Sequence, residues 1–312
     1  KLDEAISDLK YAEELEPRDF RTINLLVLVQ TEKVRRVIQR ATQGENVQQE
    51  FQTVVSTAVQ DAQRLTALYR EEPNLWRAQA ALYELVIPYI QGSERFATEA
   101  YQKAAEREPA NPEIYVQWGR AGLAFADRIG ITADQAQGKA REDLLRARTE
   151  NLQQIVQLFQ RAIQAKQDFA PAHFLLAQTA LRLGNVDAAI QSVENAKAAA
   201  PFDTGVAFQL GLLYYQKNDL TRAQQEFERA VSLNENYSNA RYFLGLVYDR
   251  RGDREKAIDQ FRRIGKLNPD NAEVQRILAN LSAGKPALNG IVPPAAPPEK
   301  RNDTPVRQEQ VR

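Results

Sequence analysis

Apolar residues recur through the middle of the chain with a period of 34 residues, and within each period they fall at helical spacing. The segment 170–203 predicts two amphipathic helices separated by Gly184 and Asn185. The same order of apolar, small and turn residues follows in 204–237 and 238–271 without a gap. Three consecutive helical hairpins are therefore predicted, because a fixed period of this length indicates a stacked repeat.

Small residues occupy the positions at which the two helices of a hairpin would approach most closely. They are Ala177, Gly211 and Gly245 on the first helix, and Ala189, Ala223 and Ala257 on the second. Gly184 and Gly252 supply the turn between the helices, and Asn218 stands at the equivalent place. Glycine and asparagine both tolerate a left-handed backbone, so a tight turn is expected at each of the three.

This arrangement resembles the tetratricopeptide repeat (TPR), a helix–turn–helix unit of 34 residues. The resemblance is sharp over 170–271 and implies that the fold is all-α. The expected architecture is a right-handed TPR superhelix, or α-solenoid, of about six helix-turn-helix repeats. The N-terminal repeats are enlarged, and a Pro-rich tail follows at the C-terminus.

The rest of the chain is divided around the regular repeats. Residues 1–17 are expected to be a half repeat with the second helix only, and 18–169 to be three enlarged TPR-like repeats. Three regular repeats fill 170–271, a C-terminal helix fills 272–283, and 284–312 is expected to be a Pro-rich extended tail.

Long helices are expected within the enlarged repeats. One runs from about Phe20 to Ala41 and is followed by a turn at Gly44. Another is expected to begin at Thr132, a favourable N-cap residue, and to continue to about Lys166.

The composition excludes several kinds of function. The chain has 312 residues, with 41 Lys and Arg against 41 Asp and Glu, one His and no Cys. Without Cys there is no disulfide and no thiolate metal site, and a single His excludes a histidine pair as metal ligands. The balanced charge argues against nucleic acid as a partner. No apolar run is long enough to cross a bilayer, so no membrane insertion by this segment is expected.

The chain also lacks Met and begins at Lys1, which favours a processed product or a fragment. A chain without Cys and Met resists oxidation, and this leans toward a cell-surface or extracellular setting. A cytoplasmic adaptor is the alternative.

Catalytic chemistry is not indicated by any motif. The chain has no glycine-rich phosphate-binding loop and no G-x-S-x-G turn. His173 stands alone and is expected to be a partly buried packing residue. We therefore expect no enzyme activity, no metal and no cofactor.

The candidate binding surface lies on the first helices of the regular repeats, which line the concave groove of a TPR solenoid. An apolar, aromatic groove with Arg at its edge suits an extended or helical peptide. The peptide-groove candidates are Phe174, Gln178, Leu181, Arg182, Phe208, Leu212, Tyr215, Tyr242, Leu246 and Arg250. The alternative is that these side chains contact only neighbouring repeats or the chain's own tail.

The function expected first is a non-enzymatic scaffold that binds a protein or peptide segment in this groove. A second hypothesis is a self-assembling subunit, because the chain starts with a second helix and ends with a first helix. Such ends could stack head-to-tail into an extracellular filament, through Leu2, Ile6, Leu9, Val274, Ile277 and Leu281. The alternative, which we favour for residues 1–17, is the stump of a longer array.

A third hypothesis places the chain in a larger bacterial protein. The enlarged repeats and the Pro-rich tail are diffusely similar to the soluble TPR region of membrane-anchored glycan polymerase/ligase-like proteins.

Overall fold

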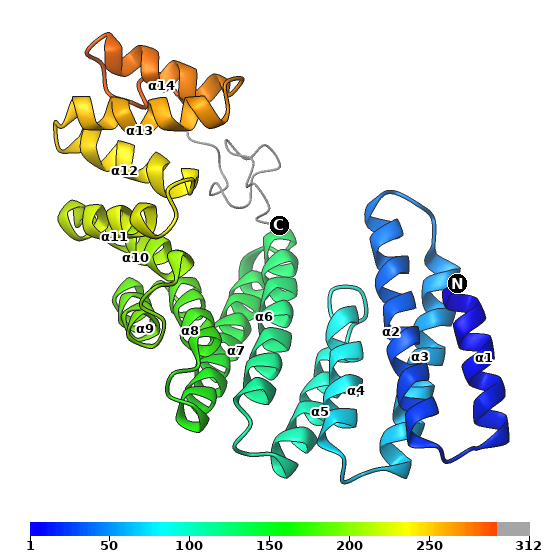
Figure 1. The fold of residues 1–312 in the computed structure, drawn as a ribbon. Helices are drawn as coiled ribbons and strands as arrows, with labels where there is room; N and C mark the ends of the chain where they lie inside the picture. Colours follow the sequence, from blue (N-terminus) through cyan, green and yellow to red (C-terminus); the bar gives the residue numbers. More distant parts are fainter. Residues whose placement is uncertain (292–312) are drawn as a thin grey trace. The chain divides into compact units, whose positions relative to one another are not determined.

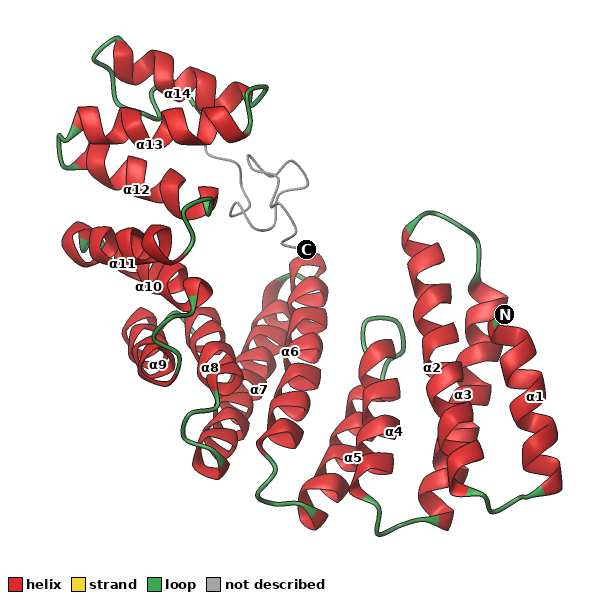
Figure 2. Ribbon diagram, viewed as in Figure 1, coloured by secondary structure: helices red, strands yellow, loops and turns green. Residues whose placement is uncertain are grey.

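The computed structural model describes residues 1–291, and fourteen helices with no strand make up the regular structure of this part (Figure 1, Figure 2). The all-α prediction is confirmed for these residues. The chain divides into two compact units, an N-terminal unit of residues 1–183 and a C-terminal unit that begins at Gly184. None of the described helices is both long enough and apolar enough to cross a membrane.

The N-terminal unit contains eight helices, which pack in chain order, and its long hairpins are α2 with α3 and α6 with α7. One apolar core joins α2, α3 and α4, and a second joins α4 to α8. The helices are α1 (Leu2–Leu15), α2 (Phe20–Thr42), α3 (Gln48–Leu68), α4 (Pro73–Val86), α5 (Ser93–Arg107), α6 (Pro112–Gln135), α7 (Gly138–Ala165) and α8 (Ala170–Arg182).

Up to residue 291, the C-terminal unit contains six helices, and each packs against the next one along the chain. They are α9 (Val186–Ala199), α10 (Thr204–Gln216), α11 (Leu220–Leu233), α12 (Ser238–Arg250), α13 (Arg254–Leu267) and α14 (Ala272–Ser282). Acidic and amide side chains begin several of these helices, since each accepts a hydrogen bond from a free backbone N–H of the first turn. Asp203 accepts from the Val206 N–H at 2.9 Å, and Asn271 accepts from the Val274 N–H at 3.0 Å.

The turns between paired helices have the backbone that the sequence indicates. Gly184 and Gly252 have φ values of +77° and +85°, and Asn218 at the equivalent place has φ +63°. The prediction of a left-handed residue at each of these positions is confirmed.

The small positions of the repeat are places of close helix approach. A Cβ atom on Gly245 would lie 2.6 Å from the ring of Phe261, and one on Gly119 would lie 2.3 Å from the ring of Phe159. Both distances are far below ordinary carbon–carbon contact, so a larger residue at either of these two positions would have to displace the aromatic ring of the second helix. The close approach predicted at Gly245 is confirmed, and Gly119 in an enlarged repeat shows the same packing.

The structure differs from the sequence prediction between α6 and α7. Thr132 does not begin a helix but lies within α6, where its hydroxyl donates to the Arg128 carbonyl oxygen at 3.0 Å. The break comes at Ala136 and Gln137, whose backbones are extended. The prediction was wrong because a threonine inside a helix can satisfy its hydroxyl on the preceding turn as well as on an N-cap.

Residues 284–291, expected to begin an extended tail, instead form hydrogen-bonded turns against the last helices. The Ala287 side chain is fully buried, and its N–H donates to Asp249 at 2.8 Å. The Asn280 side-chain amide donates to the carbonyl oxygens of Ala287 and Asn289 at 3.1 and 2.8 Å. The rest of the predicted Pro-rich tail, residues 292–312, lies outside the described residues.

Candidate partner-binding surface

Two of the predicted groove aromatics of the C-terminal unit point into its core. Phe208 is only 2% exposed, and its ring lies 5.1 Å from that of Tyr237 and 5.9 Å from those of Phe227 and Phe243. Tyr242 is 5% exposed and stands edge-on to Phe261. For these two rings the contacts are those of the alternative interpretation, packing against neighbouring helices.

The Tyr242 hydroxyl also donates to Glu273 on α14 at 2.5 Å, which fixes the ring between two successive first helices. Leu246, one turn further along α12, is buried as well. These residues therefore pack between neighbouring helices and present little exposed area to a partner.

The other groove candidates of this unit form an accessible edge. Leu212 and Tyr215 on α10 are half-buried, and Arg250 on α12 is exposed. The Arg250 guanidinium lies 5.1 Å from the centre of the Tyr215 ring and donates to the Asn218 side chain at 2.7 Å. Tyr215 also packs edge-on against Phe243 at 5.7 Å. A held aromatic with a cation over it is the kind of anchor that interfaces use.

The candidates of the N-terminal unit lie together on α8. Four side chains remain partly exposed there, namely Phe174, Gln178, Leu181 and Arg182. Arg182 reaches across to α6 and donates to Asp127 at 2.5 Å. One end of this surface is therefore already neutralised by an internal ion pair.

The two predicted assembly faces differ in exposure. On α1, Leu2, Ile6 and Leu9 are half-buried, so part of each side chain stays open to solvent. On α14 the corresponding side chains are used internally, since Val274, Ile277 and Leu281 are at most 1% exposed. The apolar stripe of α14 therefore faces its own unit.

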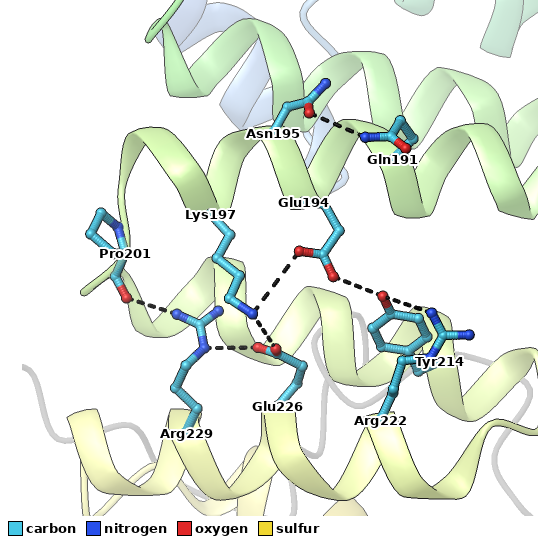
Figure 3. Close-up of polar contacts among 9 residues, drawn as sticks. All are labelled: Gln191, Glu194, Asn195, Lys197, Pro201, Tyr214, Arg222, Glu226 and Arg229. Atoms are coloured by element: carbon cyan, nitrogen blue, oxygen red, sulfur yellow. Dashed lines mark hydrogen bonds and ion pairs between the residues drawn. The ribbon is translucent and has the colours of Figure 1, made fainter.

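A network of charged and polar side chains ties α9, α10 and α11 together (Figure 3). Glu226, only 7% exposed, accepts from Lys197 at 2.6 Å and from Arg229 at 2.8 Å, and Arg229 also donates to the Pro201 carbonyl oxygen. Nearby, the Tyr214 hydroxyl donates to Glu194 at 2.7 Å. Every carboxylate of the network has a cation or a hydroxyl donor beside it, so the network is suited to holding helices together.

The electrostatics of Tyr214 agree with that structural role. Burial, aided by the hydrogen bond to Glu194, raises the pKa of Tyr214 to about 12. The phenol therefore stays protonated at neutral pH and acts as a hydrogen-bond donor. The same pair recurs 34 residues later, where the Tyr248 hydroxyl donates to Glu228 at 2.7 Å, and burial again raises the pKa of this tyrosine.

Possible ligands for a metal ion do not gather in the described residues, where no group of three or more His, Asp or Glu side chains is placed to hold one. His173 is buried on α8, with Nε2 lying 2.8 Å from the Gln167 carbonyl oxygen. Its surroundings are those of a packing residue.

One feature of the N-terminal unit has no counterpart among the sequence candidates. An apolar cavity of about 310 Å³ lies at the tip of the α2–α3 hairpin and is lined by Ile38, Ala41, Val47, Phe51 and Tyr89, with Glu45, Asn46 and Gln48 at its polar side. Tyr89 comes from the loop between α4 and α5 and is 51% exposed. The one sequence signal for it is the Pro88-Tyr89 step between two helical segments.

Comparison with known proteins agrees with the repeat pattern. The family model described as "Tetratricopeptide repeat" matches residues 147–209 and 214–281. No curated protein sequence matches the chain. TPR proteins are in general non-catalytic modules for interaction with other proteins.

Several solved structures are similar in fold. A MamA fragment from Desulfovibrio magneticus RS-1 is 21% identical, with a TM-score of 0.45, and the match covers 62% of this chain and 97% of that one. A thermophilic TPR protein of Thermus thermophilus is 17% identical, with a TM-score of 0.42 and coverage of 70% and 98%. PilF of Pseudomonas aeruginosa is 14% identical, with a TM-score of 0.49 and coverage of 82% and 98%. Residues 147–209 and 214–281 are therefore built of tetratricopeptide repeats.

Proposed function

We propose that this chain is a non-enzymatic scaffold that binds a protein segment on the exposed faces of its first helices. The observation that carries the proposal is the edge formed by Leu212, Tyr215 and Arg250 in the C-terminal unit. The edge combines a half-buried leucine, a half-buried tyrosine and an exposed guanidinium 5.1 Å from the tyrosine ring. Partly exposed apolar anchors bordered by Arg are typical of surfaces that bind peptides.

The chemistry of the bound segment follows from that edge. Leu212 and Tyr215 favour an apolar or aromatic side chain. Arg250 has no ion pair in the described part of the chain and favours a carboxylate next to that side chain. On α8, Phe174 and Gln178 offer a further partly exposed apolar and amide surface.

The experiment is selection of a displayed library of random twelve-residue peptides on the full chain. We expect the selected peptides to share an apolar side chain near an acidic one. The double variant Tyr215→Ala/Arg250→Ala should lose them, whereas Phe202→Ala should keep them. Phe202 is a suitable control because it is 83% exposed in the same unit, in the turn before α10. Peptides that bind the double variant as well as the parent chain would remove this edge as the binding surface.

Head-to-tail stacking has weaker support than scaffold binding. The half-open stripe of α1 favours a covering helix, but the α14 residues meant to supply it are buried in their own unit. Light scattering across a range of concentrations tests it directly, since stacking predicts a mass that rises with concentration.

A further inference from the structure

The cavity at the tip of the α2–α3 hairpin has the composition of a binding pocket. Its walls are Ile38 and Ala41 from α2, Val47 and Phe51 from the start of α3, and the ring of Tyr89. Tyr89 stands edge-on to Phe51, with ring centres 5.8 Å apart, so one side of the tyrosine is packed and the rest is open. About 310 Å³ leaves room for one leucine- or phenylalanine-sized side chain.

The loop that carries Tyr89 is held in place from α6. The Arg128 guanidinium donates through Nη1 to the carbonyl oxygens of Ile87 and Ile90 at 2.9 and 3.0 Å, and through Nη2 to Glu94 at 2.7 Å. Glu94 in turn accepts from the Gly92 N–H at 3.0 Å, and Ser93 donates its hydroxyl to the Ile90 carbonyl at 2.7 Å. An exposed aromatic on a loop fixed in this way loses little freedom on binding, and this favours its use as an anchor.

The charge beside the cavity selects among possible partners. Glu45 lines the cavity, and Glu50 directly precedes the lining residue Phe51. Both carboxylates pair with the same cation, Arg40, at 2.7 and 3.0 Å. Two carboxylates that share one guanidinium leave one negative charge uncompensated. A partner with a positive charge next to its apolar side chain therefore complements this end of the hairpin.

We propose that this cavity is a second protein-binding site, distinct from the exposed faces of α8, α10 and α12, and that it takes a leucine-sized side chain flanked by Lys or Arg. The site depends on the enlargement of the repeat within 18–73, because Ile38, Ala41 and Val47 belong to the added hairpin tip. It involves no covalent chemistry. Its occupant is a segment of a protein partner, recognised by one apolar and one basic side chain.

The test uses capped dipeptide amides and the full chain, with binding followed by saturation-transfer NMR. Acetyl-Lys-Leu-amide should bind, and saturation should be transferred from the protein to its leucine methyl groups. Acetyl-Glu-Leu-amide should bind about threefold more weakly. Tyr89→Ala should lower the affinity for acetyl-Lys-Leu-amide at least about fivefold, as expected when an anchoring aromatic side chain is removed. Tyr11→Ala should leave binding unchanged, because Tyr11 is an exposed tyrosine of the same unit on α1.

A second variant distinguishes loss of the binding site from loss of the fold. Ala41→Phe fills the cavity from the exposed side of α2 and should abolish transfer while the circular dichroism spectrum stays helical. The proposal is overturned if neither dipeptide gives transfer, if Tyr89→Ala and Ala41→Phe bind like the parent, or if acetyl-Glu-Leu-amide binds as well as acetyl-Lys-Leu-amide. The double variant Tyr215→Ala/Arg250→Ala should keep this binding, which separates failure here from failure of the first-helix proposal.

Discussion

Gly211 lies so close to the ring of Phe227 that a Cβ atom at Gly211 would be 2.5 Å from Cε1 of the phenylalanine. Carbon atoms in packed proteins meet at about 3.5–4.0 Å, so an alanine there must displace a fully buried ring. The same pairing of glycine with phenylalanine occurs in the next repeat, at Gly245 and Phe261. The glycine therefore sets how closely the two helices of a hairpin approach.

Gly211→Ala should destabilise the protein by about 1–3 kcal/mol, the usual cost of overpacking a core. Urea unfolding of the full chain, followed by circular dichroism, measures it. The matched control is Gly265→Ala in α13, where a new Cβ would meet its nearest neighbours at 3.9 Å. Because alanine is the better helix former, the control should be neutral or gain up to about 1 kcal/mol. Equal losses from both substitutions would mean that close approach is not the cause.

The sequence predicts well where the two helices of a hairpin approach closely, because that approach is local to one hairpin. The 34-residue register marks Gly211 and Gly245 as positions of close approach and gives Asn218 the turn position held by Gly184 and Gly252 in the neighbouring repeats. The structure then shows that the rings packed against the two glycines are those of Phe227 and Phe261. Each close contact joins residues fewer than 20 positions apart, and each turn lies within one repeat. Helical period and turn chemistry are sufficient for them.

Whether the predicted groove aromatics point toward solvent or into the core could not be predicted in the same way. The helical period places Phe208 and Tyr242 at one register position, but the rotation of successive hairpins decides whether that position faces solvent or the next first helix. The same limit applies to Ile277, since an amphipathic pattern shows which face of a helix is apolar and not what covers it. The Tyr89 loop was missed because Arg128, which holds it, is 41 residues from Ile87 along the chain.

The hydrogen bond from Tyr214 to Glu194 should make the free energy of unfolding fall as the pH rises into the alkaline range. Burial raises the pKa of Tyr214 in the folded protein to about 12, above the value of about 10 expected in the unfolded chain. A raised pKa of this kind contributes stability below pH 10, and this contribution is lost as pH rises to 12. Tyr214→Phe should therefore cost about 1 kcal/mol at pH 7 and progressively less from pH 10 to 12.

Urea unfolding of the parent and of Tyr214→Phe at pH 7, 9, 11 and 12 measures this difference. Tyr11→Phe is the control, because Tyr11 is 64% exposed and its substitution should change stability little at any of these pH values. If the loss of unfolding free energy caused by Tyr214→Phe stays constant up to pH 12, the hydrogen bond donated by the phenol is not the source of that stability.

The buried carboxylate of Glu226 should be one of the more sensitive positions of the C-terminal unit. It accepts from both Lys197 and Arg229, so Glu226→Ala leaves two cations around an emptied site (Figure 3). Removing one member of a buried ion pair typically costs about 3–5 kcal/mol, and we expect a loss near the lower end because Arg229 keeps the Pro201 carbonyl.

The next repeat indicates how that loss can be reduced. The positions of Lys197 and Glu226 are taken 34 residues later by Val231 and Gln260. The double variant Lys197→Val/Glu226→Gln should therefore cost less than the sum of its single substitutions, by at least about 0.5 kcal/mol in urea unfolding. Strict additivity would contradict direct coupling between the two side chains.

Arg128 should control the mobility of the loop between α4 and α5 without being needed for the helices around it. Arg128→Ala removes three hydrogen bonds, two to loop carbonyls and one to Glu94, so the backbone from Ile87 to Gly92 loses its attachment to α6. Amide hydrogen exchange at Tyr89 and Ile90 should become at least about tenfold faster, corresponding to about 1.4 kcal/mol of lost protection. Arg128→Lys should not restore it, because one ammonium group cannot reproduce the fork that reaches both carbonyls and the carboxylate. Arg120→Ala, on the exposed face of the same helix, is the control and should leave exchange in the loop unchanged. If exchange in Arg128→Ala equals that of the parent, the loop is held by its own turns, and the fixed placement of Tyr89 does not depend on α6.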